Sequence, residues 1–336
     1  MKKIIMAALL ATSAVAAFAD VGLSGTMDAG YTSAKAPGSN AAKTGFTSGG
    51  MTTSNIGVNG KEDLGNGASA VFELSSFLSD GTGATLGGSS PNTFTRSAFV
   101  GVTDKKLGSV TLGRQMAPNF LPTILFNAYG DSAAYGPLWH ATYFGNTGNP
   151  TALMYNDTGW DNAVSYTTPS IGGANVSAIT SRNATGGNTG ANFLYFKGNL
   201  GLTGFYQKTR VYSTGSFLPN IFTGGQPATA KGVGASYDFK VAKVFATWQD
   251  AKDTSVQING KTTQVSALVP FGPGNIMAEY ATSKYNGGKT TKYNEWAVGY
   301  DYALSKKTDA YVTGGKTSVT GLSDGSTIGA GLRVRF

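Results

Sequence analysis

The side chains able to do chemistry in this chain are few, and most are charged groups rather than nucleophiles. The 336 residues include one histidine, His140, and no cysteine. A transition-metal site or a histidine-based triad needs further such groups within reach, so we expect His140 to be a packed loop residue. No glycine-rich nucleotide-binding loop is recognisable. The sequence therefore predicts no enzyme and no cofactor, and a calcium site in the acidic loops is not indicated.

Two charged residues have positions that suit the control of ion passage. Arg96 lies in an alternating segment, residues 94–100, and if Phe99 faces lipid, Arg96 faces the aqueous side. Asp131 is the only acid within residues 119–150. Opposite charges across a narrow aqueous path focus a field and discriminate between ions. The competing interpretations are an arginine merely exposed near a loop and an aspartate that only forms a turn.

A second set of polar residues lies at the alternate positions that face water in neighbouring predicted strands. Ile56 and Val58 have the opposite, apolar parity. The segment 119–150 adds a tyrosine close to Asp131. Beside Arg96 and Asp131, the predicted pore-lining set is Asn55, Asn59, Lys61, Glu73 and Tyr129.

The elements that position these residues are predicted to be β-strands. In residues 327–336, for example, Ile328 and Leu332 alternate with polar residues such as Arg333. A period of two indicates a strand with one apolar and one polar face. This pattern predicts sixteen strands, at 20–32, 52–63, 68–79, 95–104, 109–117, 161–170, 174–182, 191–198, 200–212, 230–239, 242–252, 261–271, 274–284, 292–304, 306–317 and 326–336.

The connections between these strands alternate between short turns and longer polar loops. Outer-membrane barrels have this asymmetry, and an even strand number closes the sheet without free edges. We therefore predict an all-β, sixteen-stranded antiparallel transmembrane barrel with both termini at the short-turn rim. The connection at 118–160 is far longer than the others, and its aromatic residues argue against disorder. We expect it to fold into the lumen and narrow it.

The first nineteen residues have the features of a cleaved signal peptide, with Lys2 and Lys3 before an apolar stretch and small residues at a cleavage site. The mature barrel is expected to span residues 20–336. The net charge of +8 becomes +6 once both lysines are removed. Nucleic-acid binding is a common role of basic chains, but we do not expect it because the lysines are dispersed and the chain is exported.

Arg114 raises a separate question because it has the parity of the apolar face. It aligns with Val110 and Leu112, while Thr111 and Gly113 face the other way. An arginine that faces lipid at mid-membrane costs about 2–4 kcal/mol. Two interpretations stay open: a contact with a neighbouring chain, or a local bulge that turns the side chain inward.

Several segments are similar to those of the general diffusion porins of Gram-negative outer membranes, closest to the neisserial and betaproteobacterial branch. The resemblance implies a homotrimer in the outer membrane whose third long loop, 118–160, folds inward. It also implies passive diffusion of small hydrophilic solutes, with wall arginines facing loop acids. The matching segments, spread over essentially the whole mature chain, are 21–31 (VGLSGTMDAGY), 57–68 (GVNGKEDLGNGA), 107–115 (LGSVTLGRQ), 165–169 (SYTTP) and 331–336 (GLRVRF).

The resemblance also implies partners and roles for single residues. Phe336 is similar to the terminal signal read by the barrel-assembly machinery, and Arg114 would meet a neighbour's second loop in the trimer. Outer-membrane lipid and lipopolysaccharide would surround the barrel. The chain departs from the family pattern at Asn55, where many relatives carry arginine, and at 160–162, where a wall arginine is missing. The constriction should therefore be more aromatic and less polarised than is usual in the family.

Taken together, these features predict a water-filled channel for passive diffusion of small hydrophilic solutes and ions. A mild anion preference is expected from the positive net charge and Arg96. Two alternatives stay open. One is a substrate-selective channel for an anion such as phosphate or a small carboxylate. The other is a barrel with a plugged lumen that serves as a surface adhesin.

Overall fold

The structure, a computed structural model, describes residues 20–86, 93–143, 158–183, 186–210, 228–253, 258–287 and 289–336. The predicted signal peptide and residues 144–157 of the long connection lie outside the described residues.

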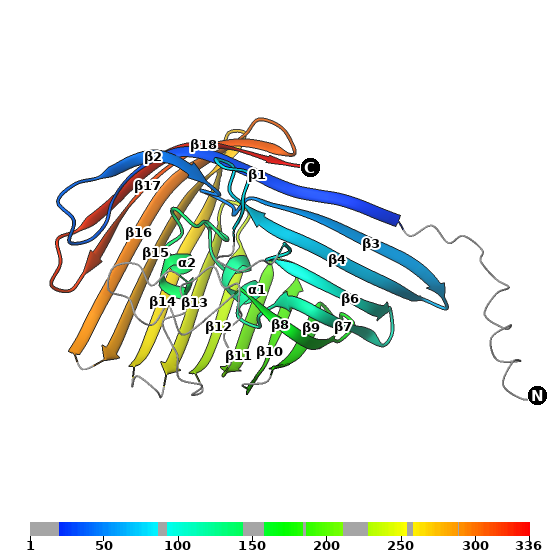
Figure 1. The fold of residues 1–336 in the computed structure, drawn as a ribbon. Coiled ribbons are helices and arrows are strands. Elements are labelled where there is room, and N and C mark those ends of the chain that lie inside the picture. The colour runs from blue at the N-terminus through cyan, green and yellow to red at the C-terminus, as the bar shows by residue number, and fades with distance from the viewer. Residues whose placement is uncertain are drawn as a thin grey trace, which may run out of the picture.

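The alternating sequence forms a closed antiparallel barrel (Figure 1). All sixteen predicted strands are confirmed within a few residues at each end. They are β1 (Asp20–Lys35), β3 (Asn55–Gly65), β4 (Ala68–Leu78), β6 (Ser97–Asp104), β7 (Gly108–Met116), β8 (Gly159–Thr167), β9 (Ala174–Asn183), β10 (Gly186–Lys197), β11 (Leu200–Thr209), β12 (Ala228–Asp238), β13 (Lys243–Asp253), β14 (Ile258–Phe271), β15 (Gly274–Gly287), β16 (Lys289–Ala303), β17 (Thr308–Val319) and β18 (Gly325–Arg335).

The barrel closes through its first strand. On one side of β1, Tyr31 lies opposite Ala330 of β18, and on the other side Leu23 lies opposite Val58 of β3. The wall strands are therefore paired on both sides. The hydrocarbon core of a membrane requires this, because it offers no water to satisfy backbone amide and carbonyl groups.

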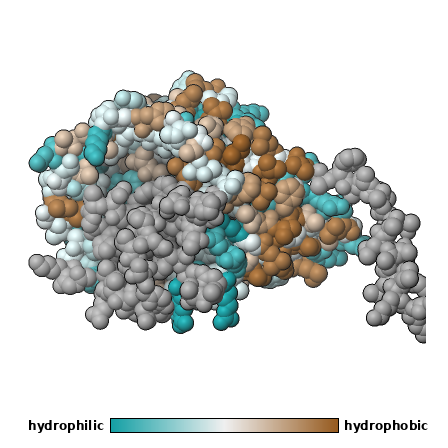
Figure 2. All heavy atoms as spheres, in the orientation of Figure 1, coloured by the Kyte–Doolittle hydropathy of each residue, from teal (hydrophilic) through white to brown (hydrophobic). Residues whose placement is uncertain are grey.

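The two faces of the wall have opposite polarity. On β6, Val100 and Val102 are exposed on the outside, whereas Ser97 is buried inside. Figure 2 shows apolar residues gathered over the outer surface near β3, β4 and β6. Such an outer face suits contact with lipid, and the inner face suits water and polar partners.

Four elements were not predicted. The short strands β2 (Lys43–Ser48) and β5 (Thr85–Leu86) extend the pairing of β1 and β4 at the loop rim. Two helices, α1 (Phe120–Leu125) and α2 (Pro137–Tyr143), form within the long connection between β7 and β8. Within the described part of the chain, no helix is long and apolar enough to cross a membrane.

Candidate channel constriction

The long connection between β7 and β8 folds back into the barrel, as predicted. Its described part runs to Tyr143, and α1 and α2 lie inside the ring of strands (Figure 1). Phe126 and Leu138 are both 0% exposed there. Backbone at membrane depth must find hydrogen-bond partners in surrounding protein, and the wall supplies them.

Two acids of the wall hold α2 in place. Glu279 Oε1 accepts a hydrogen bond from the Leu138 backbone NH at 2.7 Å, where the first turn of the helix leaves amides unpaired. Glu295 Oε1 lies 2.9 Å from His140 Nδ1, and the Ala133 carbonyl oxygen lies 2.9 Å from His140 Nε2. The imidazole thus has an acceptor at each nitrogen, which suits its doubly protonated form.

The charge state of His140 follows from the same contacts. Burial lowers the pKa of His140, but the Glu295 carboxylate, the Ala133 carbonyl oxygen and Glu279 raise it, and together they outweigh burial, so the pKa lies above its ordinary value. His140 is therefore a packed loop residue, as expected from the sequence. The two glutamates were predicted only to be on the polar face, and the sequence offered no local signal that they hold the loop.

Tyrosine hydroxyls hold the middle of the loop. The Tyr129 hydroxyl forms a hydrogen bond with Thr313 Oγ1 at 2.8 Å, and the Tyr135 hydroxyl forms one with Thr32 Oγ1 at 2.6 Å. Tyr129 is only 2% exposed. The prediction that Tyr129 lines the open path is therefore wrong, because its ring is enclosed between the loop and the wall. Its contact fixes the loop instead.

Asp28 supports the loop indirectly and was missed by the sequence analysis. Its Oδ2 accepts hydrogen bonds from the backbone NH groups of Met51 and Thr52 at 2.9 and 2.7 Å. Its Oδ1 accepts one from the Tyr311 hydroxyl at 2.6 Å. The segment held in this way offers the Gly50 carbonyl oxygen to the Ser132 hydroxyl of the loop at 2.7 Å.

The interior of the loop is aromatic, in agreement with the sequence. Phe120 meets Trp139 edge to face with 6.0 Å between ring centroids, and Trp139 lies 4.4 Å from Tyr143 by the same measure. Phe205 of the wall belongs to this cluster. Large rings packed in this way fill the lumen on the side of β11.

A cavity remains on the other side of the loop, toward β4 to β10. Its volume is about 240 Å³, and Glu73, Phe99 and Gln115 contribute to its wall while Leu121 contributes from the loop. Serine, threonine and asparagine side chains line much of the rest. A space with such a lining suits hydrated solutes.

The position of Phe99 corrects the argument used for Arg96. Phe99 shares the lumen face with Glu73, whereas Val100 faces outward. The premise that Phe99 faces lipid is wrong, because the aromatic ring belongs to the inner face. Arg96 precedes the first residue of β6, so strand parity does not determine its direction. Its guanidinium nevertheless reaches the inner face, where Nη1 lies 3.5 Å from Glu73 Oε1.

The Asp131 carboxyl interacts electrostatically with arginines of the wall. Burial raises the pKa of Asp131 to about 6, while a hydrogen bond from the Thr53 backbone NH and the positive charges of Arg96 and Arg333 act in the opposite direction. The charge of Arg96 thus acts on the Asp131 carboxyl, while the predicted opposition of the two groups across the aqueous path stays a prediction. Their role in ion selection stays a prediction.

Arg333 is a wall arginine to which the sequence analysis assigned no role. Its Nη2 donates to Asp301 Oδ2 at 2.7 Å, its Nε donates to Asp309 Oδ2 at 2.6 Å, and its Nη1 donates to Thr52 Oγ1 at 2.7 Å. Arg335 also binds Asp309, at 2.6 Å. The alternation at the C-terminus could have found Arg333 on the inner face, but its acidic partners are on other strands.

Arg114 keeps the outward parity and has found partners in its own chain. Its Nε donates to the Thr95 carbonyl oxygen at 2.7 Å, and its Nη1 donates to Asp161 Oδ1 at 2.7 Å. The pairing of β7 with β8 shifts register here, and Asn162 has a φ of 52°. A bulge is therefore present, but it brings the Asp161 carboxylate to Arg114 and does not turn Arg114 inward. A contact with a neighbouring chain stays a prediction.

The remaining predicted residues lie where parity put them. Asn55, Asn59 and Lys61 of β3 have the parity opposite to that of the exposed Ile56. Phe336 exchanges backbone hydrogen bonds with Gly25 across the barrel seam, at 3.1 and 3.3 Å. Their roles in pore lining and in assembly stay predictions.

Comparisons with known proteins agree with this architecture. The family model described as Gram-negative porin matches residues 6–322. An outer membrane porin protein of Bordetella pertussis is 27% identical over the full length of both chains. Outer membrane porin protein 32 of Delftia acidovorans is also 27% identical, over 98% of this chain and 92% of its own.

Solved structures share the fold. The anion-selective porin from Comamonas acidovorans superposes with a TM-score of 0.78 at 21% identity, covering 95% of this chain and all of that one. A trimer form of OmpT of Vibrio cholerae has a TM-score of 0.66 at 16% identity, covering 95% and 99%. With its closed sixteen-stranded barrel and its inward loop, the chain belongs to the Gram-negative porins, the β-barrel channels of the outer membrane.

Proposed function

We propose that this porin lets small hydrophilic solutes and ions diffuse passively, with a mild preference for anions. The observation that supports the proposal is a cavity lined by polar side chains, one of which, Glu73, forms an ion pair with Arg96. Asp131 on the loop adds a carboxyl whose pKa the charge of Arg96 lowers. A fixed cation next to a narrow aqueous path attracts anions, and the facing acid limits the effect.

The preference is expected to be mild because most inner cations are already paired. Arg96 shares its charge with Glu73, and Arg333 is bound by Asp301 and Asp309. Lys61 is exposed and adds positive charge near the short-turn rim. The anion-selective porin of similar fold supports the sign of the preference but not its size.

The test is electrical. Purified protein in a planar bilayer should give stable open channels, and the reversal potential in a potassium chloride gradient should have the sign of chloride preference. A cation-selective reversal potential would refute the proposed preference. Negligible conductance would refute the open channel and favour a plugged barrel, and saturable block by phosphate or a small carboxylate would favour a substrate-selective channel.

We further propose that the mature chain begins at Asp20, assembles as a homotrimer, and is delivered by the barrel-assembly machinery through its terminal Phe336. Support comes from the signal-peptide pattern and from the trimeric solved neighbour. Three equal closing steps in single-channel records, together with N-terminal sequencing of the mature protein, would test the first two points. Deletion of Phe336 should reduce the amount of folded barrel in the outer membrane.

A further inference from the structure

The joint between β1 and β18, which we call the seam, is where the wall of the barrel closes. These two strands stand at opposite ends of the barrel sequence, whereas the other neighbouring wall strands are consecutive in the sequence. The seam therefore has no turn of its own, and the entropy cost of bringing two segments together grows with the length of chain between them. Contacts that cross the seam thus contribute directly to closure of the barrel.

The inner face of the wall at the seam has small residues on β18 between larger ones on its neighbours. In one row across the three strands, Gly329 of β18 lies between Thr32 of β1 and Thr313 of β17. In the next row toward the short turns, Gly331 of β18 lies beside Tyr311 of β17. The last strand thus leaves open space toward the lumen between two strands that carry hydroxyl groups.

Two tyrosines of the constriction loop use the first of these rows. The Tyr135 hydroxyl is bonded to Thr32 Oγ1 of β1, and the Tyr129 hydroxyl is bonded to Thr313 Oγ1 of β17. Because the two threonines lie on either side of Gly329, the loop spans β18 and holds both of its neighbours. The loop therefore joins the first strand of the barrel to the far side of the last one.

The second row contains a bridge between wall strands on which the loop rests. The Tyr311 hydroxyl of β17 donates a hydrogen bond to Asp28 Oδ1 of β1 at 2.6 Å, so this side chain also crosses β18. The Tyr135 ring meets the Tyr311 ring edge to face, with 6.1 Å between centroids. Each ring is only 3% exposed. The loop and the bridge thus form one buried unit over the seam.

The glycines below this unit are required by its shape. A Cβ atom at Gly329 would overlap the Tyr135 hydroxyl oxygen, and one at Gly331 would overlap the Tyr311 hydroxyl oxygen. Gly50, between β2 and β3, lies against the same groups, and a Cβ atom there would be 2.5 Å from the Tyr311 hydroxyl oxygen. We call these three residues the glycine socket. A larger residue in the socket would displace the tyrosines from the seam.

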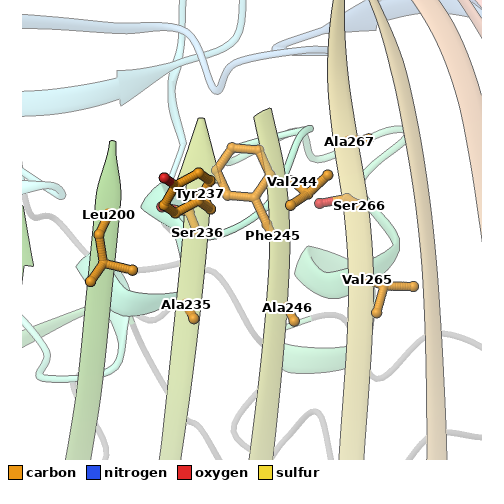
Figure 3. Close-up of a pocket in the computed structure, with 10 residues that line it drawn as sticks. All are labelled: Leu200, Ala235, Ser236, Tyr237, Val244, Phe245, Ala246, Val265, Ser266 and Ala267. Atoms are coloured by element: carbon orange, nitrogen blue, oxygen red, sulfur yellow. The ribbon is translucent and has the colours of Figure 1, made fainter. Parts of the chain in front are cut away.

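The same part of the loop is also attached to the wall away from the seam. The Ala128 backbone NH donates a hydrogen bond to Ser266 Oγ of β14 at 3.0 Å. Phe245 of β13 belongs to the same apolar cluster as Tyr129 and Tyr135. Figure 3 shows Phe245 and Ser266 among the residues that line a groove of about 530 Å³. The loop therefore connects the seam to strands that are consecutive in the sequence.

We propose that the constriction loop is a clasp for the barrel seam: Tyr129 and Tyr135 join β1 to β17 across β18, and the glycine socket makes room for them. Loop docking and seam closure then stabilise each other, because a coupling free energy acts equally in both directions. The socket is complete only when β18 has paired with β1, so the pore narrows as the barrel closes. The inference does not depend on the ion preference of the channel.

The test follows amide hydrogen exchange in the purified full-length barrel in detergent. Exchange in residues 26–35 and 326–335 reports opening of the seam, and exchange in residues 243–253 reports a part of the wall remote from it. Tyr135→Phe removes the hydroxyl and keeps the ring. We expect the seam amides to exchange about fivefold faster in this variant, the equivalent of about 1 kcal/mol for one hydrogen bond, with residues 243–253 unchanged.

Two further variants separate the clasp from general attachment of the loop. Thr142→Val removes a loop hydrogen bond of the same kind, the one to Gln249 Oε1 of β13 at 3.1 Å. It should accelerate exchange in residues 133–143 and leave the seam amides unchanged. Thr32→Val removes the partner of Tyr135 and should reproduce the effect of Tyr135→Phe. The double variant should lose no more protection than either single variant, because both remove one interaction.

A glycine substitution tests the socket itself. Gly329→Ala should accelerate exchange at the seam at least as much as Tyr135→Phe does, whereas Gly45→Ala, at a site with no atom within 4 Å of a new Cβ, should not. If Gly329→Ala does not fold, Tyr135→Phe and Thr32→Val still decide the result, because they add no bulk. Unchanged seam exchange in Tyr135→Phe, or equal acceleration at the seam in Thr142→Val, would overturn the proposal.

Discussion

Arg96 and Glu73 form an ion pair on the inner wall, with 3.5 Å between Nη1 and Oε1. Glu73 is on β4 and Arg96 directly precedes β6, so the pair joins neighbouring strands beside the cavity. Two acids thus act on Arg96: Glu73 beside it on the wall and Asp131 on the loop.

Replacing Glu73 by Gln should increase anion preference. The substitution keeps the shape of the side chain and removes the charge that offsets Arg96. A partly exposed ion pair contributes about 0.2–1 kcal/mol, so the chloride-to-potassium permeability ratio should rise about threefold. Reversal potentials in a salt gradient measure this ratio. Arg96→Gln is the matched control and should shift the ratio the other way; an unchanged ratio in both variants would mean that this pair does not act on permeating ions.

The selectivity should also depend on pH through Asp131. Its pKa of about 6 means that the carboxyl is mostly ionised at pH 7.5 and mostly protonated at pH 5. Loss of this negative charge leaves Arg96 and Arg333 less opposed, so anion preference should increase as pH falls. At both pH 7.5 and pH 5, Asp131→Asn should show the selectivity that the native channel has at pH 5. If Asp131→Asn retains the full pH dependence of the native channel, another group is responsible.

The contact between His140 and Glu295 should make loop stability depend on pH. The folded-state pKa of His140 lies above its ordinary value of 6.5. The contact therefore stabilises the loop fully below pH 6.5. This contribution, about 1.5–3 kcal/mol for a hydrogen bond to a charged group, is lost as pH rises through the folded-state pKa.

Hydrogen exchange of the loop amides measures this effect. Exchange in residues 133–143, corrected for the intrinsic pH dependence, should accelerate above neutrality in the native protein. The same amides in His140→Gln should exchange faster at low pH and show no such step. A step of equal size in the variant would contradict the assignment to His140.

Removing the Arg114 guanidinium should destabilise the barrel. Arg114→Ala leaves the Asp161 carboxylate and the Thr95 carbonyl oxygen without their partner, and breaking such a largely buried pair costs about 3–5 kcal/mol. The measurement is urea unfolding of the barrel in detergent. Arg114→Leu combined with Asp161→Leu should recover much of the loss, because it removes both charges and suits the outward face.

The oligomeric state separates the two interpretations of Arg114. If Arg114 acts only within its chain, Arg114→Ala should keep the proposed trimeric state at urea concentrations well below the unfolding midpoint. Loss of that state with an unchanged unfolding midpoint of the monomer would instead support the contact with a neighbouring chain.

The alternation of residue types was sufficient to predict the wall of this barrel. Whether a side chain points to lipid or to water is a local property of a strand, since successive residues point to opposite sides. Trp296 and Val298 alternate with Glu295 and Ala297, and this pattern alone located β16. The same reasoning placed Asn55, Asn59 and Lys61 on the inner face. The reasoning failed for Phe99, because an aromatic side chain can face either the lipid or the lumen, so the residue type does not determine the direction.

The contents of the lumen were decided only by the tertiary structure. Glu279 and Glu295 hold Leu138 and His140 across 141 and 155 residues of sequence. Arg114 donates a hydrogen bond to Asp161 across 47 residues of sequence, and Tyr311 donates one to Asp28 across 283. Such pairs have no period or spacing, because they arise when barrel closure brings distant strands around one loop. Local patterning therefore determined the wall and its two faces, whereas closure of the wall determined which charges hold the constriction and which remain free to act on ions.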